Sequence, residues 1–377
     1  GSTYISSYTF FTNSFLIFIL SQTTMQSFKH ILHLCLISGL LFLVSCAQEP
    51  QIPGKIVSFE DVFQLKNKIY LDENIKLKGI HTLNVDANGR ILIVDFLSEQ
   101  VILVDKEGNL IKEITPDSCN PGHNWKPFIA NFNKNGSILV LTKFGEIYWF
   151  SNIGECIIKG STLRKQPNMD LAFDNSGNFY FKEQSPIETY IHKSDSLGIK
   201  TSRFKIENSL PIWNGFSMRA PIETNGEDIW IGLTYFDGFY IYSQEGIKLH
   251  TIQFDSPLFT TPKQDLNERS TKKLMEDSKS YSSIIDLFKI KNGVITLIFH
   301  RFNLPNKSEK QLGISIYNKH QNNLRYVLTD ERGWFTGKDS NDLFYHIFVP
   351  SKEDIAQCKQ CGIKTTMGLN VYQLKNN

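Results

Sequence analysis

The sequence lacks an excess of charge of either sign. Its 377 residues contain 40 Lys and Arg against 38 Asp and Glu, which gives a formal net charge of +2 at pH 7. Binding to nucleic acid needs a basic patch that neutralises phosphates, and so balanced a composition provides no basis for one. We therefore expect no nucleic-acid partner.

Familiar catalytic motifs are also missing. The sequence contains no G-x-S-x-G nucleophile elbow, no H-E-x-x-H zinc helix and no glycine-rich phosphate loop. The turn at 86–89, which begins with Asp86, lacks the ligand series and terminal Glu of an EF-hand calcium loop. The sequence therefore predicts no cofactor and no metal, and it favours a role other than catalysis.

Cysteine is scarce, with six residues in the chain. Cys358 and Cys361 form a C-x-x-C motif, which supplies only two of the four ligands of a structural zinc site. A redox role would place this motif at a helix start, whereas here it falls in a predicted loop. A short-range disulfide is therefore favoured over zinc or redox chemistry. Cys119 and Cys156 are either a second pair or two buried thiols.

The first 24 residues contain no Lys, Arg, Asp or Glu, and their apolar run at 15–20 is too short to span a bilayer. We interpret residues 1–24 as a non-native or over-extended start, with a second membrane segment as the alternative. From Met25 the pattern changes, because a short polar head with Lys29 precedes an apolar stretch at 31–44. That length is typical of a secretory signal, so a signal peptide is predicted over 25–45.

The apolar stretch ends in the letters LVSC at 43–46, which resemble the lipobox of bacterial lipoproteins. The resemblance implies cleavage before Cys46 and acylation of that cysteine, and two or more acyl chains give stable membrane attachment. Ala47 resembles the outer-membrane sorting pattern. Residues 46–54 would then be the lipidated cysteine and a polar tether. The alternative is an ordinary signal peptide with Cys46 as a plain thiol.

Tight glycine turns recur along the rest of the chain. The first turn of each unit ends at Gly89, Gly136, Gly177, Gly226 or Gly293, and second turns follow the first four glycines by 18 to 21 residues. The intervening segments are short, β-branched and aromatic, which indicates buried strands. Each unit therefore consists of strand, turn, strand, loop, strand, turn, strand, as in a four-stranded propeller blade.

Six blades are predicted, beginning near residues 80, 128, 169, 216, 284 and 334. The last blade lacks a fourth strand, so an N-terminal strand at 56–59 or 68–71 is expected to complete it and close the ring. The stretch 84–108 resembles the NHL-repeat type of six-bladed β-propeller, and in particular the propeller lipoproteins of Bacteroides-like bacteria. The resemblance covers roughly residues 55–377 and implies an all-β fold at the cell envelope.

In such a blade the first and third turns lie on one face, and the other connections lie on the opposite face. The long connections, at 114–127, 256–283, 300–312 and 350–368, are all of the second kind. Long loops on a rigid scaffold often bind ligands, so this loop face is the predicted working surface; tolerated insertions are the alternative. The composition of 264–280 favours a short lid helix.

Six side chains on this face are candidates for stacking on a sugar, gripping a peptide or clamping a carboxylate: Trp125, Lys143, Glu183, Tyr235, His300 and Arg301.

Together these features predict a monomeric, lipid-anchored binding or interaction module at the bacterial outer membrane, with a glycan, a peptide or an envelope protein as its ligand. One alternative is a metal-dependent lactonase or hydrolase, since lactonases with six-bladed propellers hold a divalent ion in the channel. Asn131, Asp170 and Glu223 are its candidate ligands. The other alternative is a structural scaffold, which an apolar patch of several hundred Å² on the outer rim would favour.

Overall fold

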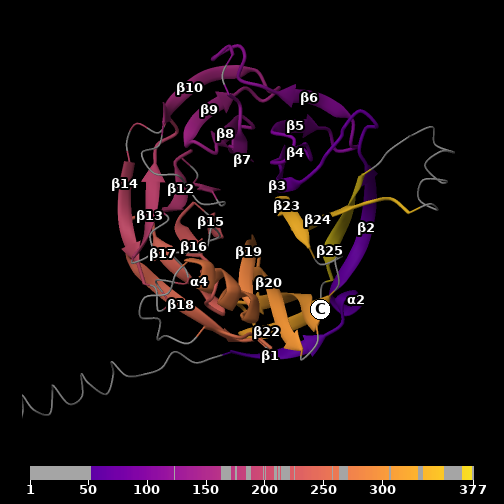
Figure 1. The fold of residues 1–377 in the computed structure, drawn as a ribbon, viewed down its shortest axis with the longest axis vertical. Coiled ribbons are helices and arrows are strands. Elements are labelled where there is room, and N and C mark those ends of the chain that lie inside the picture. Colours follow the sequence, from indigo (N-terminus) through magenta and orange to yellow (C-terminus); the bar gives the residue numbers. More distant parts are fainter. Residues whose placement is uncertain are drawn as a thin grey trace, which may run out of the picture. The chain divides into compact units, whose positions relative to one another are not determined.

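The computed structural model describes residues 52–122, 124–162, 171–174, 176–183, 188–197, 199, 201–207, 210, 213, 221–224, 226–256, 258–262, 271–304, 307–329, 334–351 and 367–375. These residues form six four-stranded antiparallel blades arranged around a ring (Figure 1). The predicted all-β, six-bladed propeller is thereby confirmed. Among the helices in these ranges, none has the length and apolar character needed to cross a membrane.

The strands of each blade follow one another in the chain, from the innermost to the outermost. Blade one contains β3 (Ile80–Val85), β4 (Ile91–Asp95), β5 (Gln100–Val104) and β6 (Leu110–Ile114). Blade two contains β7 (Pro127–Phe132), β8 (Ile138–Thr142), β9 (Glu146–Phe150) and β10 (Cys156–Thr162). Blade three contains β11 (Ala172–Phe173), β12 (Phe179–Glu183), β13 (Thr189–Ser194) and β14 (Thr201–Ile206).

The remaining blades are built in the same way. Blade four contains β15 (Ile222–Thr224), β16 (Asp228–Ile231), β17 (Gly238–Ser243) and β18 (Lys248–Asp255). Blade five contains β19 (Ser283–Ile290), β20 (Gly293–Leu304), β21 (Lys307–Asn318) and β22 (Asn323–Thr329). Blade six contains β23 (Phe335–Lys338), β24 (Leu343–Phe348) and β25 (Gly368–Leu374), followed by a fourth strand from the N-terminal part of the chain.

That fourth strand is β2 (Phe63–Tyr70), which pairs antiparallel with β25 and so closes the ring. A preceding strand, β1 (Ile52–Val57), pairs in parallel with both β18 and β22. It therefore joins the outer edges of blades four and five into one nine-stranded sheet. Between β1 and β2 lies the one-turn helix α2 (Phe59–Val62), whose first turn is capped by the Ser58 hydroxyl.

The middle strands of the blades are buried on both faces. Every residue of β4, β8 and β9 is buried, whereas the outermost strands β6 and β14 are largely exposed. Because each sheet packs between two neighbouring blades, its middle strands are continuous apolar runs rather than alternating ones. The hydrophobic core is accordingly a series of clusters at the seams between blades, such as the one shared by blades one and two.

The ring closes where blade six meets blade one. At this seam β23 approaches β3 so closely that a Cβ atom on Gly337 would lie 2.2 Å from the Leu83 carbonyl oxygen. The absence of a side chain at this position therefore permits the last blade to dock on the first.

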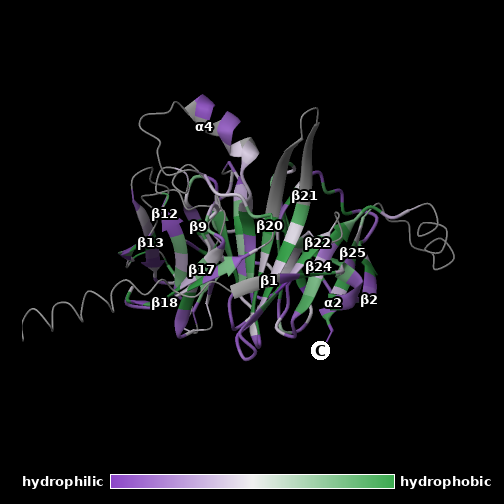
Figure 2. Ribbon diagram, turned by 90° about the horizontal axis from the view of Figure 1, so that it is seen from below, coloured by the Kyte–Doolittle hydropathy of each residue, from purple (hydrophilic) through white to green (hydrophobic). Residues whose placement is uncertain are grey.

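The two faces of the ring differ in their connections. On the loop face, β20 and β21 pair as far as Leu304 and Lys307, so the predicted loop at 300–312 is instead a long hairpin. The sequence favoured a loop because Pro305 and Asn306 are typical turn residues. The prediction was wrong because the pairing that begins in the buried halves of both strands continues as far as Leu304 and Lys307. The helix α4 (Thr271–Asp277) lies on the same face (Figure 2), which confirms a short helix within 264–280.

The opposite face carries the tight turns between the first and second strands of the blades, and we call it the turn face.

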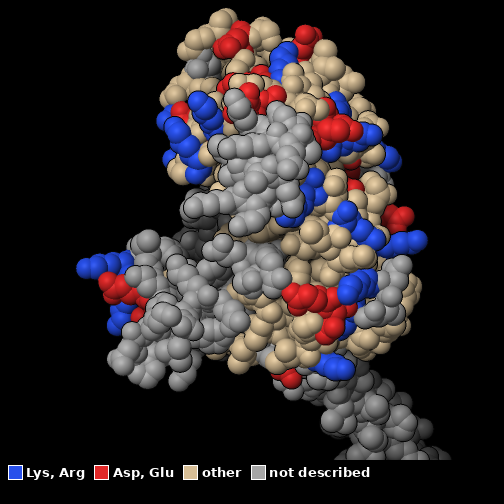
Figure 3. All heavy atoms as spheres, turned by 90° about the vertical axis from the view of Figure 1, so that its right-hand side faces the viewer, with Lys and Arg blue, Asp and Glu red and all other residues tan. Residues whose placement is uncertain are grey.

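On the outer side shown in Figure 3, Lys and Arg side chains are interspersed with Asp and Glu over the described surface. The balanced composition thus corresponds to a mixed surface on this side, without a large field of one sign.

Candidate functional site

A central cavity of about 320 Å³ lies between the innermost strands of the six blades. Five of those strands contribute side chains that can form hydrogen bonds. The polar lining residues within the strands are Thr82, Asn84, Asn131, Glu223, Asp286, Thr336 and Lys338. Among the described residues, those that blade three contributes to the lining are Leu171, Ala172 and Phe173, which are apolar.

The shape of the innermost strands explains how these side chains reach the cavity. Four of the strands have a β-bulge near their start, centred on His81, Phe128, Ile285 and Thr336. In each case the following residue lines the cavity. A bulge adds one unpaired residue and changes the direction of the next side chain, and bulges often occur beside functional sites. Short-range sequence patterns do not reveal these bulges.

Hydrogen bonds hold several of the lining side chains in place. The Asn84 amide donates to the Ala130 carbonyl oxygen at 2.7 Å and thereby links blade one to blade two. The Thr336 hydroxyl donates to the Tyr345 carbonyl oxygen at 3.2 Å. Such fixed polar groups on rigid strands, separated by apolar walls, are typical of sites that orient a small ligand.

A second depression, of about 520 Å³, adjoins the central cavity at the turn face. Both are lined by Glu223, Lys338 and Ser340. The wall of the depression is formed by the ends of the innermost strands of blades four, five and six and by the turns that follow them in blades five and six. The cavity therefore has a mouth on the turn face, which the sequence analysis did not select as the working surface.

Two of the residues that were predicted to contact a ligand lie near the seam between blades one and two on the loop face. Trp125 packs edge-to-face against Tyr148 and Phe150, so it serves the packing of blade two. Lys143 is exposed, and its ammonium lies 5.7 Å from the centre of the Phe96 ring. The structure thus places them in different environments, and neither lines the central cavity.

Two further candidates are buried. Glu183 is 5% exposed and contacts His192 at 2.8 Å and Arg203 at 3.3 Å, so it belongs to an ion-pair network on blade three. Tyr235 is 6% exposed and packs edge-to-face against Trp213. Neither side chain lines the central cavity.

The remaining predicted residues are His300, Arg301, Cys46, Cys358 and Cys361. His300 and Arg301 lie in β20, and their side chains are outside what the structure describes. Cys46, Cys358 and Cys361 lie outside the described residues. Their predicted roles, as the lipidation site and a disulfide pair, remain predictions.

The candidate metal ligands are only partly brought together. Asn131 and Glu223 both line the central cavity, and Asp170 lies outside the described residues. Glu223 lies in the strand β15 rather than in the turn to which the sequence analysis assigned it, because the short innermost strand extends to Thr224. Within the described part of the chain, no group of three His, Cys, Asp or Glu residues could hold a metal ion.

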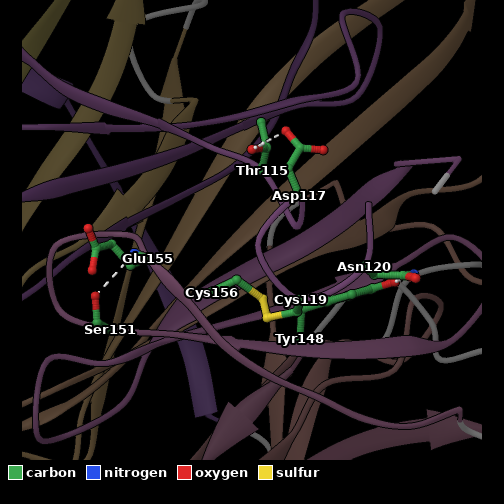
Figure 4. Close-up of a disulfide and its surroundings, with 8 residues drawn as sticks. All are labelled: Thr115, Asp117, Cys119, Asn120, Tyr148, Ser151, Glu155 and Cys156. Carbon is green, nitrogen blue, oxygen red and sulfur yellow. Dashed lines mark hydrogen bonds between the residues drawn. A yellow bond between two sulfur atoms is a disulfide. The ribbon is translucent and has the colours of Figure 1, made fainter. Parts of the chain in front are cut away.

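Cys119 and Cys156 form a disulfide with a Cα–Cα distance of 5.8 Å (Figure 4). This settles the two alternatives in favour of a pair. The segment after β6 lies against blade two, where the Asn120 amide donates to the Tyr148 hydroxyl at 2.9 Å. The disulfide therefore fixes the connection between blades one and two to the outer strand β10.

Six four-stranded blades around the polar central cavity, which we also call the channel, define a six-bladed β-propeller. Among solved structures, the chain is similar to a protein from Bacteroides fragilis described as exported, with a TM-score of 0.64, 13% identity, and coverage of 87% of this chain and 100% of the other. It is also similar to a member of the DUF4221 family from Bacteroides vulgatus, with a TM-score of 0.58, 10% identity, and coverage of 84% and 98%. These likenesses show the fold alone. No protein-family model and no curated protein matches the sequence.

Proposed function

We propose that this protein is a lipid-anchored binding protein of the bacterial cell envelope that holds a small polar ligand in its central channel. The observation that supports this function is the cavity lining, in which five innermost strands contribute hydrogen-bonding side chains. Convergent polar groups on separate rigid strands favour a ligand with several hydroxyl or amide groups. A sugar or a short peptide has this chemistry.

Three observations support export and anchoring. The signal pattern at 25–45 ends in the lipobox-like letters LVSC, and the fold resembles that of a protein described as exported. The Cys119–Cys156 disulfide suits an oxidising compartment outside the cytosol. The proposed location is the outer membrane, with Cys46 as the acylated residue.

The anchor is tested by expressing the full chain and its Cys46→Ser variant with an alkyne-labelled fatty acid. The unchanged chain is expected to carry the label and to fractionate with membranes, whereas the variant is expected to lose both properties. Labelling of the variant at the same level would refute acylation at Cys46.

Binding is tested by calorimetric titration of the mature chain with mono- and disaccharides and with di- and tripeptides. The variants Asn131→Ala and Glu223→Gln each remove one polar group from the channel and are expected to weaken binding about tenfold, the loss of one or two hydrogen bonds. Lys143→Ala changes an exposed side chain on the loop face and is the matched control. Loss of binding in Lys143→Ala, with the channel variants unaffected, would assign the ligand to the loop face instead.

A further inference from the structure

The mouth of the channel on the turn face has a distinct set of charges. Three lysines line this depression: Lys289 at the end of β19, Lys291 in the following turn, and Lys338 at the end of β23. Two carboxylates, from Glu223 and Asp342, line the same depression. A lysine that is already paired with a carboxylate attracts an anionic ligand less strongly than an unpaired one, so the ion pairs among these groups matter for binding.

Asp342 is fully engaged by blades five and six. One of its carboxylate oxygens lies 3.0 Å from the Lys338 ammonium, and the other accepts the Lys291 backbone N–H at 2.9 Å. The Lys338 ammonium also donates to the Asp339 carbonyl oxygen at 2.9 Å. Lys338 and Asp342 therefore neutralise one another.

The other two lysines, Lys289 and Lys291, are in a different position. Among the described residues, no carboxylate lies within ion-pair distance of the ammonium of Lys289 or Lys291. Lys289 is half-buried, and its ammonium lies 5.6 Å from the centre of the Trp230 ring. Burial lowers the pKa of Lys289, while the negative charges of Glu223 and Asp228 raise it. A partly desolvated ammonium that faces a cavity gains from an anionic ligand.

We propose that the turn-face mouth binds the anionic group, a carboxylate or a phosphate, of a small hydroxylated ligand, with Lys289 and Lys291 as its cationic contacts. The inference rests on the proposed function, because the neutral part of the ligand would occupy the adjoining channel near Asn131. An acidic sugar combines both features. Its acidic group would lie between the two ammonium groups, and its hydroxyl groups would face the channel.

The test uses calorimetric titration of the mature chain with glucuronate, its neutral amide, glucose 6-phosphate and glucose. Glucuronate or glucose 6-phosphate is expected to bind at least about tenfold more tightly than its neutral counterpart, as charge-assisted hydrogen bonds predict. A preference for glucuronate would identify a carboxylate ligand, and one for glucose 6-phosphate a phosphate. Lys289→Gln and Lys291→Gln are expected to reduce this preference, whereas Lys106→Gln, at an exposed turn of blade one, is expected to leave it unchanged.

A second measurement does not depend on the choice of sugar. Acetylation of lysines by acetic anhydride, followed by mass spectrometry, is compared with and without inorganic phosphate. Phosphate is expected to slow acetylation of Lys289 and Lys291 relative to Lys106. Equal binding of charged and neutral sugars, together with no protection by phosphate, would overturn the anion site. Loss of sugar binding in the channel variants would still support the proposed function in that case.

Discussion

Asp237 accepts two hydrogen bonds from Ser256, one from the backbone N–H and one from the hydroxyl, each at 2.8 Å. The Ser256 hydroxyl also lies 2.9 Å from that of Ser315 on β21. A chain of three polar side chains thus joins blade four to blade five. Burial raises the pKa of Asp237 to about 6, although the hydrogen bonds from Ser256 act in the opposite direction.

Asp237 is expected to make stability depend on pH. Its pKa is raised from 3.8 to about 6 on folding, so between these values the native state keeps a proton that the unfolded chain has released. The free energy of unfolding should therefore fall as the pH rises through this window, by up to about 1.4 kcal/mol per pH unit from this group. Asp237→Asn should lose this dependence.

The measurement is urea unfolding of both proteins at pH 4.5 and pH 7. Between pH 4.5 and pH 7, the free energy of unfolding of the Asp237→Asn variant should rise by about 1–3 kcal/mol relative to that of the unchanged protein. Asp117→Asn, at an exposed position, is the control. An identical pH response in the two variants would contradict the prediction.

Loss of the Cys119–Cys156 disulfide is expected to destabilise the propeller. The bond closes a loop with a sequence separation of 37. The reduced entropy of the cross-linked unfolded chain predicts a stabilisation of about 3–4 kcal/mol for a loop of this length. The variant with both cysteines changed to Ser should show this loss in the free energy of unfolding. Reduction of the unchanged protein should reproduce it, while the double variant should not respond to the reductant.

Gly337→Ala is expected to weaken the closure of the ring. The added Cβ would lie 2.2 Å from the Leu83 carbonyl oxygen, so β23 would have to move away from β3. We expect a loss of at least about 2 kcal/mol in the free energy of unfolding. Gly122→Ala adds a Cβ with nothing within 4 Å but at a φ of +73°, so it should cost only about 1 kcal/mol. Equal losses in the two variants would exclude the steric explanation.

Deletion of residues 52–57 tests the role of β1. The deletion would leave the outer edges of β18 and β22 without the strand that pairs with both. Unpaired strand edges promote association between molecules, so we expect a lower melting temperature together with oligomers in light scattering. A monomeric protein of unchanged melting temperature would show that β1 adds nothing to the fold.

The blades could be predicted from the sequence because their turns are local. A glycine such as Gly89, with a φ of +81°, is required by its own turn and therefore recurs at blade spacing. The insertion of β1 between two blades could not be predicted, since it depends on backbone pairing with β18 and β22, far along the chain. Aromatic composition likewise gave no means of telling that Trp125 and Tyr235 pack within the protein rather than face a ligand.

The candidate site was predictable only in part. Asn131 and Glu223 stand out in the sequence as polar residues in or beside innermost strands, and both line the channel. Asp286 was not identified, because the bulge that precedes it interrupts the alternation from which a strand face is inferred. Lys289 and Lys291 are adjacent to an ordinary turn, and only the meeting of blades four, five and six makes that turn the wall of a depression.

The pairing of β2 with β25 has a consequence for the order of folding. The described ends of the chain are partners, and Lys375 and Glu60, which share a hydrogen bond, are 315 residues apart. Blade six consequently lacks both β25 and β2 until β25 has been synthesised, because β2 reaches the blade only by pairing with β25. Contacts of such high sequence separation fold slowly, so the open-ring intermediate is the species that chaperones and proteases of its compartment would encounter.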